Sequence, residues 1–126
     1  MKKTILLLAL LYTHLACEDI DILSPIVETR EASQITPNQA QLNGELVVTG
    51  TEPIITIGFQ YDTDSLKVAQ GGLPIVSTLD FRANEPGPFS ATVTGLTENT
   101  KYYFRAVAET SDLIASGEIK SFTTAE

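Results

Sequence analysis

The side chains that most often act as nucleophile, general base or zinc ligand are scarce in this chain. It has one histidine, His14, and one cysteine, Cys17, and both lie among the first 17 residues. Ser-His-Asp and Cys-His catalysis need a histidine in the folded domain, as do histidine-containing zinc sites. The sequence also contains no phosphate loop and no dinucleotide-binding fingerprint. We therefore expect no enzyme activity, no catalytic residue, no metal ion and no other cofactor.

Carboxylates are the remaining candidates for chemistry, because the chain has 16 Asp and Glu residues. A glycosidase holds two carboxylates about 5–10 Å apart across a cleft, but most of these residues fall in expected turns or at solvent-facing strand positions. The stretch Asp62-Thr63-Asp64-Ser65 offers oxygen atoms of the kind that Ca²⁺ prefers. The rest of a twelve-residue calcium loop is absent, and Asp and Ser are common turn residues. We interpret this stretch as a solvated turn.

Cys17 is the residue with the most distinctive chemistry. It follows a basic start at Met1-Lys2-Lys3, an apolar run over residues 5–12 and the pair Leu15-Ala16. Eight apolar residues are too few to span a bilayer, which takes about 20, so residues 1–16 are predicted to be a signal peptide. The segment resembles a bacterial lipoprotein signal, although His14 stands where such signals usually have leucine. The resemblance implies that the Cys17 thiol is joined to diacylglycerol and its freed amine is acylated.

Residues 17–25 are predicted to be a linker that starts at the lipidated cysteine and reaches roughly 30 Å when fully stretched. Glu18, Asp19 and Asp21 make it acidic, which suits a solvated tether and equally resembles an export tag of surface lipoproteins. If the segment is a lipoprotein signal, the protein is anchored in the cell envelope, in the outer membrane. Whether it faces the cell surface is left open by the sequence. If Cys17 is not acylated, it is a small apolar residue near an ordinary cleavage site.

Without residues 1–16 the chain has six basic and 16 acidic residues, and therefore a net charge of −10. Such a chain repels nucleic acid and gains no electrostatic attraction to anionic lipid. Its one cysteine permits no intramolecular disulfide. About 110 residues can nevertheless bury enough apolar surface to fold.

The strongest structural signal is the segment 96–108, a polar turn followed by an alternating strand. Tyr102, Phe104, Ala106 and Ala108 share one face of that strand, which predicts a half-buried β-strand. A tyrosine at the start of such a strand can bury its ring and bond its hydroxyl to the preceding turn. The Leu-x-x-Asn-Thr-x-Tyr spacing from Leu96 to Tyr102 resembles the E–F corner of fibronectin type III domains. We therefore assign Tyr102 and Leu96 a structural role.

The other strands are predicted from the same alternation and from the turn residues between them. They cover residues 26–33, 39–48 and 55–62, a short edge strand at 75–79, a strand around 89–93 and a last strand at 117–124. No stretch has sustained helical periodicity. Gly44 lies within an unbroken alternation, so we expect a large side chain over its backbone, and we expect Phe122 to be inside.

The resemblance to fibronectin type III domains extends over residues 26–124, through Leu42-Asn43-Gly44 and the ending Ser121-Phe122-Thr123-Thr124. It implies an all-β, antiparallel β-sandwich of immunoglobulin-like Greek-key topology, with about seven strands. The expected sheets are the strands at 26–33, 39–48 and 89–93 against those at 55–62, 101–108 and 117–124. Residues 26–126 then form one domain.

Two surfaces are candidates for binding a partner. One is the loop over residues 109–116, because loops on a rigid sandwich often carry binding residues, and it contains Ser111, Asp112, Leu113 and Ile114. The other is the outer face of the strand at 101–108, where Tyr103 and Arg105 have a composition enriched at interfaces. Leu113 and Ile114 can equally fold over the core, and the strand face can equally be an ordinary open sheet face.

We conclude from the sequence that this is a non-enzymatic, lipid-anchored envelope protein that presents one interaction module. It reaches the membrane through Cys17, binds no nucleic acid, and has a protein or glycan partner. The alternatives are a carbohydrate-binding accessory lipoprotein of a polysaccharide-uptake system and a structural subunit or spacer of a surface assembly. An exposed aromatic platform would favour sugar binding, and an uncovered strand edge would favour assembly.

Overall fold

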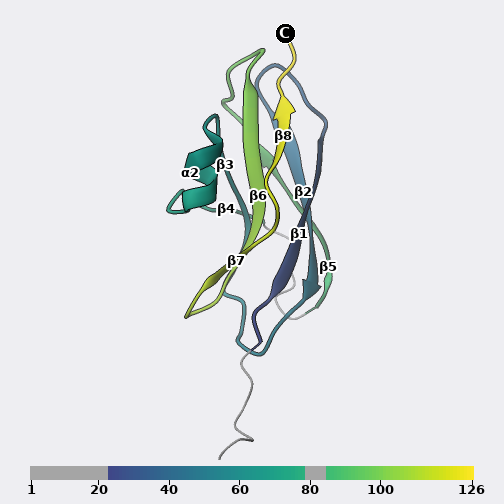
Figure 1. Cartoon of the computed structure of the whole chain (residues 1–126). Helices are drawn as coiled ribbons and strands as arrows, with labels where there is room; N and C mark the ends of the chain where they lie inside the picture. Colours follow the sequence, from purple (N-terminus) through teal and green to yellow (C-terminus); the bar gives the residue numbers. More distant parts are fainter. Residues whose placement is uncertain (1–22, 79–84) are drawn as a thin grey trace, which may run out of the picture.

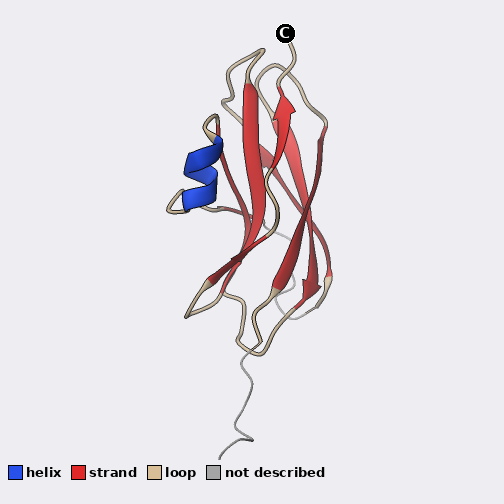
Figure 2. Cartoon of the chain, viewed as in Figure 1, coloured by secondary structure: helices blue, strands red, loops and turns tan. Residues whose placement is uncertain are grey.

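A computed structural model describes residues 23–78 and 85–126 as a two-sheet antiparallel β-sandwich (Figures 1 and 2). The elements are β1 (Ile26–Ser33), β2 (Ala40–Val48), β3 (Thr56–Asp62), α2 (Ser65–Gln70), β4 (Val76–Ser77), β5 (Gly87–Val93), β6 (Lys101–Glu109), β7 (Ile114–Ser116) and β8 (Lys120–Thr123). The predicted all-β sandwich class is confirmed. The predicted signal peptide and the acylation site Cys17 lie outside the described residues, as does Leu79 of the predicted edge strand.

The two sheets have the predicted membership. One contains β1, β2 and β5 in that order, and the other runs β4-β3-β6-β7, with β8 also paired to β6. The pairs within both sheets are antiparallel. The short edge strand is present as β4, which pairs with β3 at Gly58 and Phe59. This arrangement brings β1 of one sheet alongside β7 and β8 of the other (Figure 1).

The last strand differs from the prediction, which placed one strand over residues 117–124. The structure has a shorter strand there, β8, and a separate strand β7 in the stretch predicted as a loop, and the two pair with opposite ends of β6. The break contains Gly117 and leaves Ile119 36% exposed, while Phe122 is 7% exposed. Ile119 and Phe122 are three residues apart, and a strand with a period of two cannot bury both. Interrupting the strand lets Phe122 face the core, as predicted.

Alternating apolar residues of both sheets meet in one core, as expected for a half-buried strand pattern. The Phe59 ring lies 5.2 Å from the Phe89 ring and 6.4 Å from the Phe104 ring, between ring centroids. Each buried side chain of this size contributes about 1.5–3 kcal/mol through removal of apolar surface from water. The fully buried core side chains include Leu42, Leu46, Ile57, Phe59 and Phe104.

Gly44 on β2 lies under an aromatic ring. A Cβ atom added there would lie 2.9 Å from Cζ of Phe89 and 3.1 Å from Cβ of Ala106. Real Cβ atoms rarely come so close to another carbon, so a side chain at this position would displace the ring. The prediction that a large side chain packs over this backbone is confirmed.

The helix α2 was not predicted, because no stretch of the sequence has sustained helical periodicity. It has six residues, which is less than two full turns and too short to show a periodic apolar stripe. The Asp64 side chain caps it by accepting a hydrogen bond from the Leu66 N–H at 2.9 Å. Val68 is its one buried residue, and through it α2 packs against β3 and β6 on the outer face of their sheet (Figure 2).

Candidate functional site

Tyr102 occupies a corner between the β5–β6 connection and the core. Its side chain is 7% exposed, and the backbone N–H of Thr97 donates to its hydroxyl oxygen at 2.8 Å. The ring stacks on Phe122 at 5.6 Å between centroids. Leu96 is 8% exposed and its N–H donates to the Asn38 carbonyl at 2.9 Å. These contacts tie the loop before β6 to the sandwich and use the hydroxyl for structure.

On the outer face of β6, α2 covers one part, and side chains of the strand make contacts within the domain. Arg105 donates from Nε and Nη2 to Oε1 of Gln60, both at 3.1 Å, and Nε2 of Gln60 donates to the Leu73 carbonyl at 2.9 Å. Gln60 is only 1% exposed, so Arg105 satisfies a buried amide oxygen. Burial lowers the pKa of the Arg105 guanidinium. The half-buried Tyr103 ring has the Lys101 ammonium 5.3 Å from its centroid. The sequence predicted either a binding surface or an ordinary open sheet face here.

The β6–β7 connection is a tight turn, shorter than the loop that was predicted over residues 109–116. Thr110 is 3% exposed, and its Oγ1 accepts the N–H groups of Asp112 and Leu113, both at 3.3 Å. Ser111 and Asp112 are exposed, Leu113 is half-buried, and Ile114 is 45% exposed within β7. The turn therefore holds its four candidate residues in fixed positions, with three of them facing solvent.

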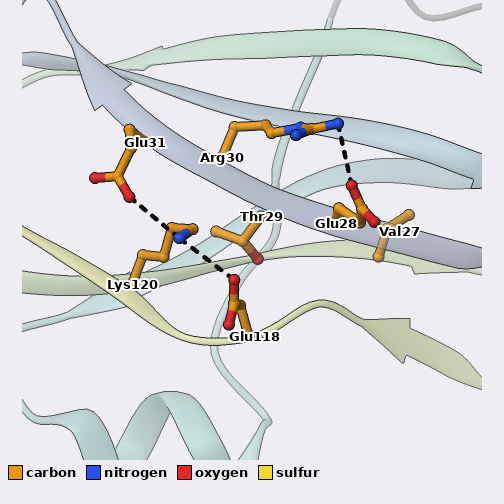
Figure 3. A pocket seen from close by; sticks show the side chains of 7 residues that line it. All are labelled: Val27, Glu28, Thr29, Arg30, Glu31, Glu118 and Lys120. Atoms are coloured by element: carbon orange, nitrogen blue, oxygen red, sulfur yellow. Dashed lines mark hydrogen bonds and ion pairs between the residues drawn. The ribbon is translucent and has the colours of Figure 1, made fainter.

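A surface hollow lies elsewhere, along β1 and the chain that leads into β8 (Figure 3). Its volume is about 480 Å³, and it is lined by Val27, Glu28, Thr29, Arg30, Glu31, Glu118 and Lys120. We call this hollow the β1–β8 groove. Sequence reasoning missed it, because its two walls lie about 90 residues apart along the chain and no local pattern predicts that they meet.

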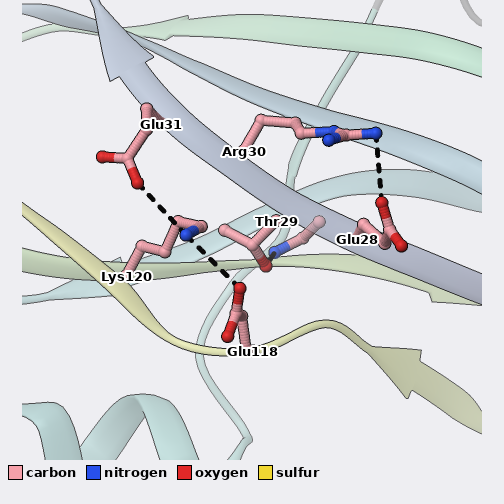
Figure 4. Close-up of polar contacts among 7 residues, drawn as sticks. Glu28, Thr29, Arg30, Glu31, Glu118 and Lys120 are labelled. Atoms are coloured by element: carbon pink, nitrogen blue, oxygen red, sulfur yellow. Dashed lines mark hydrogen bonds and ion pairs between the residues drawn. The ribbon is translucent and has the colours of Figure 1, made fainter.

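Ion pairs arrange the charges of the β1–β8 groove (Figure 4). Lys120 Nζ lies 3.1 Å from Oε2 of Glu31 and 3.3 Å from Oε1 of Glu118. These two contacts raise the pKa of Lys120, with the hydrogen bond to Glu31 the larger cause. Arg30 Nη2 lies 3.1 Å from Glu28 and 2.6 Å from Glu45. Each cation is thus shared by two carboxylates, all of them at least partly exposed.

A buried threonine shapes the floor of the β1–β8 groove. Thr29 is 3% exposed, and its Oγ1 accepts the Ala106 N–H at 3.0 Å, which joins the two sheets. The Gly117 N–H donates to the Ala106 carbonyl at 2.9 Å. A Cβ at Gly117 would lie 2.7 Å from Thr29 Oγ1, so only glycine lets the chain between β7 and β8 pass this close to β1.

A second hollow of about 380 Å³ lies beside the Tyr102 corner. It is lined by Tyr61, Asp62, Thr63, Leu73, Pro74, Val76 and Tyr102. The Tyr61 and Tyr102 rings are tilted, with centroids 6.2 Å apart. Asp62 Oδ1 accepts the Asp64 N–H at 2.9 Å, and Asp64 caps α2. In the described ranges no three Asp, Glu, His or Cys side chains gather in a way that suits a metal ion.

The fold is similar to that of solved sensor domains. No family model and no curated protein matches the sequence. The sensor domain of the anti-sigma factor RsgI4 from Pseudobacteroides cellulosolvens aligns with 85% of this chain and 98% of its own length, with 19% identity and a TM-score of 0.59. A solution structure of that domain aligns with 81% of this chain and 76% of its own length, with 20% identity and a TM-score of 0.60. A structure described as a myokine has 17% identity, covers 84% of this chain and all of its own, and has a TM-score of 0.51.

These comparisons confirm a sandwich fold shared with sensor domains, while membership of the fibronectin type III family is not shown. In the part of the chain that the structure describes, no helix has the length and apolarity needed to cross a membrane. The charged side chains of the groove are engaged with one another, and the carboxylates of Asp62 and Asp64 are engaged in local turns.

Proposed function

We propose that this chain is a lipid-anchored cell-envelope protein, held in the outer membrane by acylated Cys17, whose single fibronectin type III-like domain binds a partner without catalysis. The same fold serves RsgI4 as a sensor domain, and the proposal extends to this chain only the general role of recognition. The partner is a protein or a glycan.

The observation that carries the proposal is the β1–β8 groove with its exchangeable ion pairs. Exposed ion pairs contribute only about 0–1 kcal/mol each, so a partner can displace Glu118 from Lys120 at little cost. A carboxylate or a row of hydroxyl groups on the partner would then take the place of the released side chain. Buried Thr29 and Val27 keep the floor rigid, which lowers the entropy lost on binding.

The test compares two charge reversals in the acylated protein. Lys120→Glu changes the β1–β8 groove, and Lys67→Glu makes the same change in charge on α2. We expect affinity enrichment from solubilised membranes to recover a partner with the wild type and with Lys67→Glu, and to lose it with Lys120→Glu. Equal recovery with both variants would show that the groove is not the binding site.

Anchoring has its own test. An alkyne fatty acid fed to cells should label the wild type and leave Cys17→Ser unlabelled and soluble. An unlabelled wild type released in soluble form would contradict the anchor, and the His14 departure from the usual signal would be the first cause to examine.

Sugar binding is the second candidate, and the hollow beside the Tyr102 corner favours it. Tyr61 lines this hollow with Leu73 and Pro74, and Asp62 and Thr63 add polar atoms. An aromatic ring with neighbouring hydrogen-bonding groups is a combination that suits a sugar ring. Titration with oligosaccharides should shift the NMR signals of this hollow, and Tyr61→Leu should weaken binding several-fold while Tyr103→Leu does not. Shifts confined to other surfaces would remove this candidate.

A further inference from the structure

Large apolar side chains are exposed together at one end of the sandwich. The structure exposes nine such side chains in its described ranges, and most of them lie at the end where β1 begins. We call this group the apolar end, and its members are Leu23 (56% exposed), Ile26 (52%), Val48 (38%), Ile55 (64%) and Ile114 (45%). Exposed apolar groups gathered in one region mark an interaction surface more often than scattered ones do.

Backbone contacts hold the apolar end together. Ile26 pairs with Val48 where β1 meets β2. The Ile55 N–H donates to the Glu109 carbonyl at 2.8 Å, and Glu109 pairs with Ile114. The start of β1, the end of β2, the β2–β3 connection and the start of β7 lie at the same, lower end of the molecule in Figure 1. The five side chains are therefore carried by separate segments that the sheets fix relative to one another.

The chain enters the domain at this same end. The Leu23 N–H donates to Thr51 Oγ1 at 2.9 Å, and the Thr51 N–H donates to the Leu23 carbonyl at 3.0 Å. These two bonds attach the chain to the β2–β3 connection, so any tether to Cys17 is counted from Leu23. Six peptide steps separate Cys17 from Leu23, and fully stretched they reach roughly 20 Å.

The tether decides which end of the domain is near the lipid. β6 has nine residues, and a strand of that length spans about 30 Å. An acylated Cys17 therefore holds the apolar end within about 20 Å of the lipid surface. The opposite end, with the β1–β2 turn, can lie a further strand length away.

The charges near the apolar end favour a neutral lipid surface. Glu52, Glu109 and Asp112 are close to it in the chain. The described cations lie elsewhere: Arg30 and Arg105 in mid-strand, Lys67 on α2, Lys101 at the far end of β6, and Lys120 in the β1–β8 groove. Zwitterionic headgroups accept apolar side chains without the repulsion that anionic lipids would add.

We propose that the apolar end is a lipid-facing surface that rests on zwitterionic headgroups and orients the domain with its opposite end outward. The inference depends on the proposed lipid anchor at Cys17. In this orientation the strands run away from the membrane, and the β1–β8 groove and the Tyr61 hollow remain accessible along the sides of the sandwich.

The test measures orientation on vesicles of phosphatidylcholine with the full acylated protein. Because Cys17 is the only cysteine and its thiol would be joined to diacylglycerol, a new cysteine can be labelled alone with a polarity-sensitive fluorophore. The labelled positions are Ile55→Cys and Ile114→Cys at the apolar end, and Ile35→Cys in the β1–β2 turn as the matched control, since Ile35 is also exposed (38%). A nitroxide on the lipid headgroup serves as quencher.

We expect several-fold stronger quenching and a blue-shifted emission at positions 55 and 114 than at position 35. Replacing both Ile26 and Val48 by serine should reduce that difference without unfolding the domain, because both side chains are exposed. Equal quenching at all three positions in protein that floats with the vesicles would overturn the orientation while leaving the anchor intact. Protein that does not float would overturn the anchor, and the inference with it.

Discussion

At the residue scale, Tyr102 shows how one hydroxyl supports a whole corner. Tyr102→Phe would leave the Thr97 N–H without its partner in a partly buried position. We expect the free energy of unfolding to fall by about 1 kcal/mol or somewhat more, measured by urea denaturation. Tyr103→Phe is the matched control, because it removes the same atom from a half-buried side chain on the outer face. A loss of equal size in both variants would remove the special role of the corner.

Lys120 provides a prediction in alkaline solution. Its hydrogen bonds to Glu31 and Glu118 raise its pKa above the usual 10.5. A raised pKa in the folded state means that the ammonium contributes stability below the unfolded-state pKa, and that this contribution is lost as pH rises through the folded-state pKa. The Cε signal in NMR should titrate at lower pH in Glu31→Gln than in the wild type. An unchanged titration would show that Glu31 does not hold the ammonium in solution.

At the element scale, the packing of β2 against β5 depends on the absence of a side chain at Gly44, over which the Phe89 ring lies. Gly44→Ala would bring a Cβ to 2.9 Å from Phe89, and overpacking of this kind costs typically 1–3 kcal/mol. Phe89→Leu shortens the facing side chain, so the same alanine should cost less in that background. Chemical denaturation of the four proteins of this cycle measures the coupling. Additive effects would mean that the ring moves aside freely.

The elements also show what sequence can predict. Along β2 the buried residues Ala40, Leu42 and Leu46 alternate with more exposed ones. A half-buried strand buries every second residue, so its sequence shows apolar residues with a period of two. The same rule predicted that Phe122 is buried, whereas the division into two sheets was predicted from the resemblance to fibronectin type III domains. The helix α2 could not be predicted in this way, because six residues with one buried valine show no periodic pattern. Its cap, Asp64, is also a common turn residue.

The candidate sites were harder to predict than the fold. Tyr103 and Arg105 have the composition of an interface, yet Arg105 is occupied by the buried oxygen of Gln60, a partner 45 residues away. The β1–β8 groove likewise depends on contacts between chain segments that only the sheet topology brings together. Composition records which groups a chain has, whereas a site depends on which of them remain unsatisfied after folding.

At the scale of the whole molecule, the excess of negative charge opposes folding. Without residues 1–16 the net charge is −10, so compaction brings like charges together. The described ion pairs of Arg30 and Lys120 are exposed or half-exposed, and ion pairs at such positions contribute little to stability. We therefore expect long-range repulsion to outweigh these few short contacts.

Salt should reveal this balance. Raising NaCl from about 0.01 M to about 0.15 M shortens the Debye length from about 30 Å to about 8 Å, which screens distant repulsion more than contacts near 3 Å. We expect the melting temperature of the chain from residue 17 onward to rise over that range, measured by circular dichroism. Glu52→Gln, which removes one negative charge outside the described ion pairs, should raise the melting temperature at low salt and reduce its dependence on salt. A melting temperature that falls as salt is added would mean that the ion pairs of β1 and β8 outweigh the repulsion.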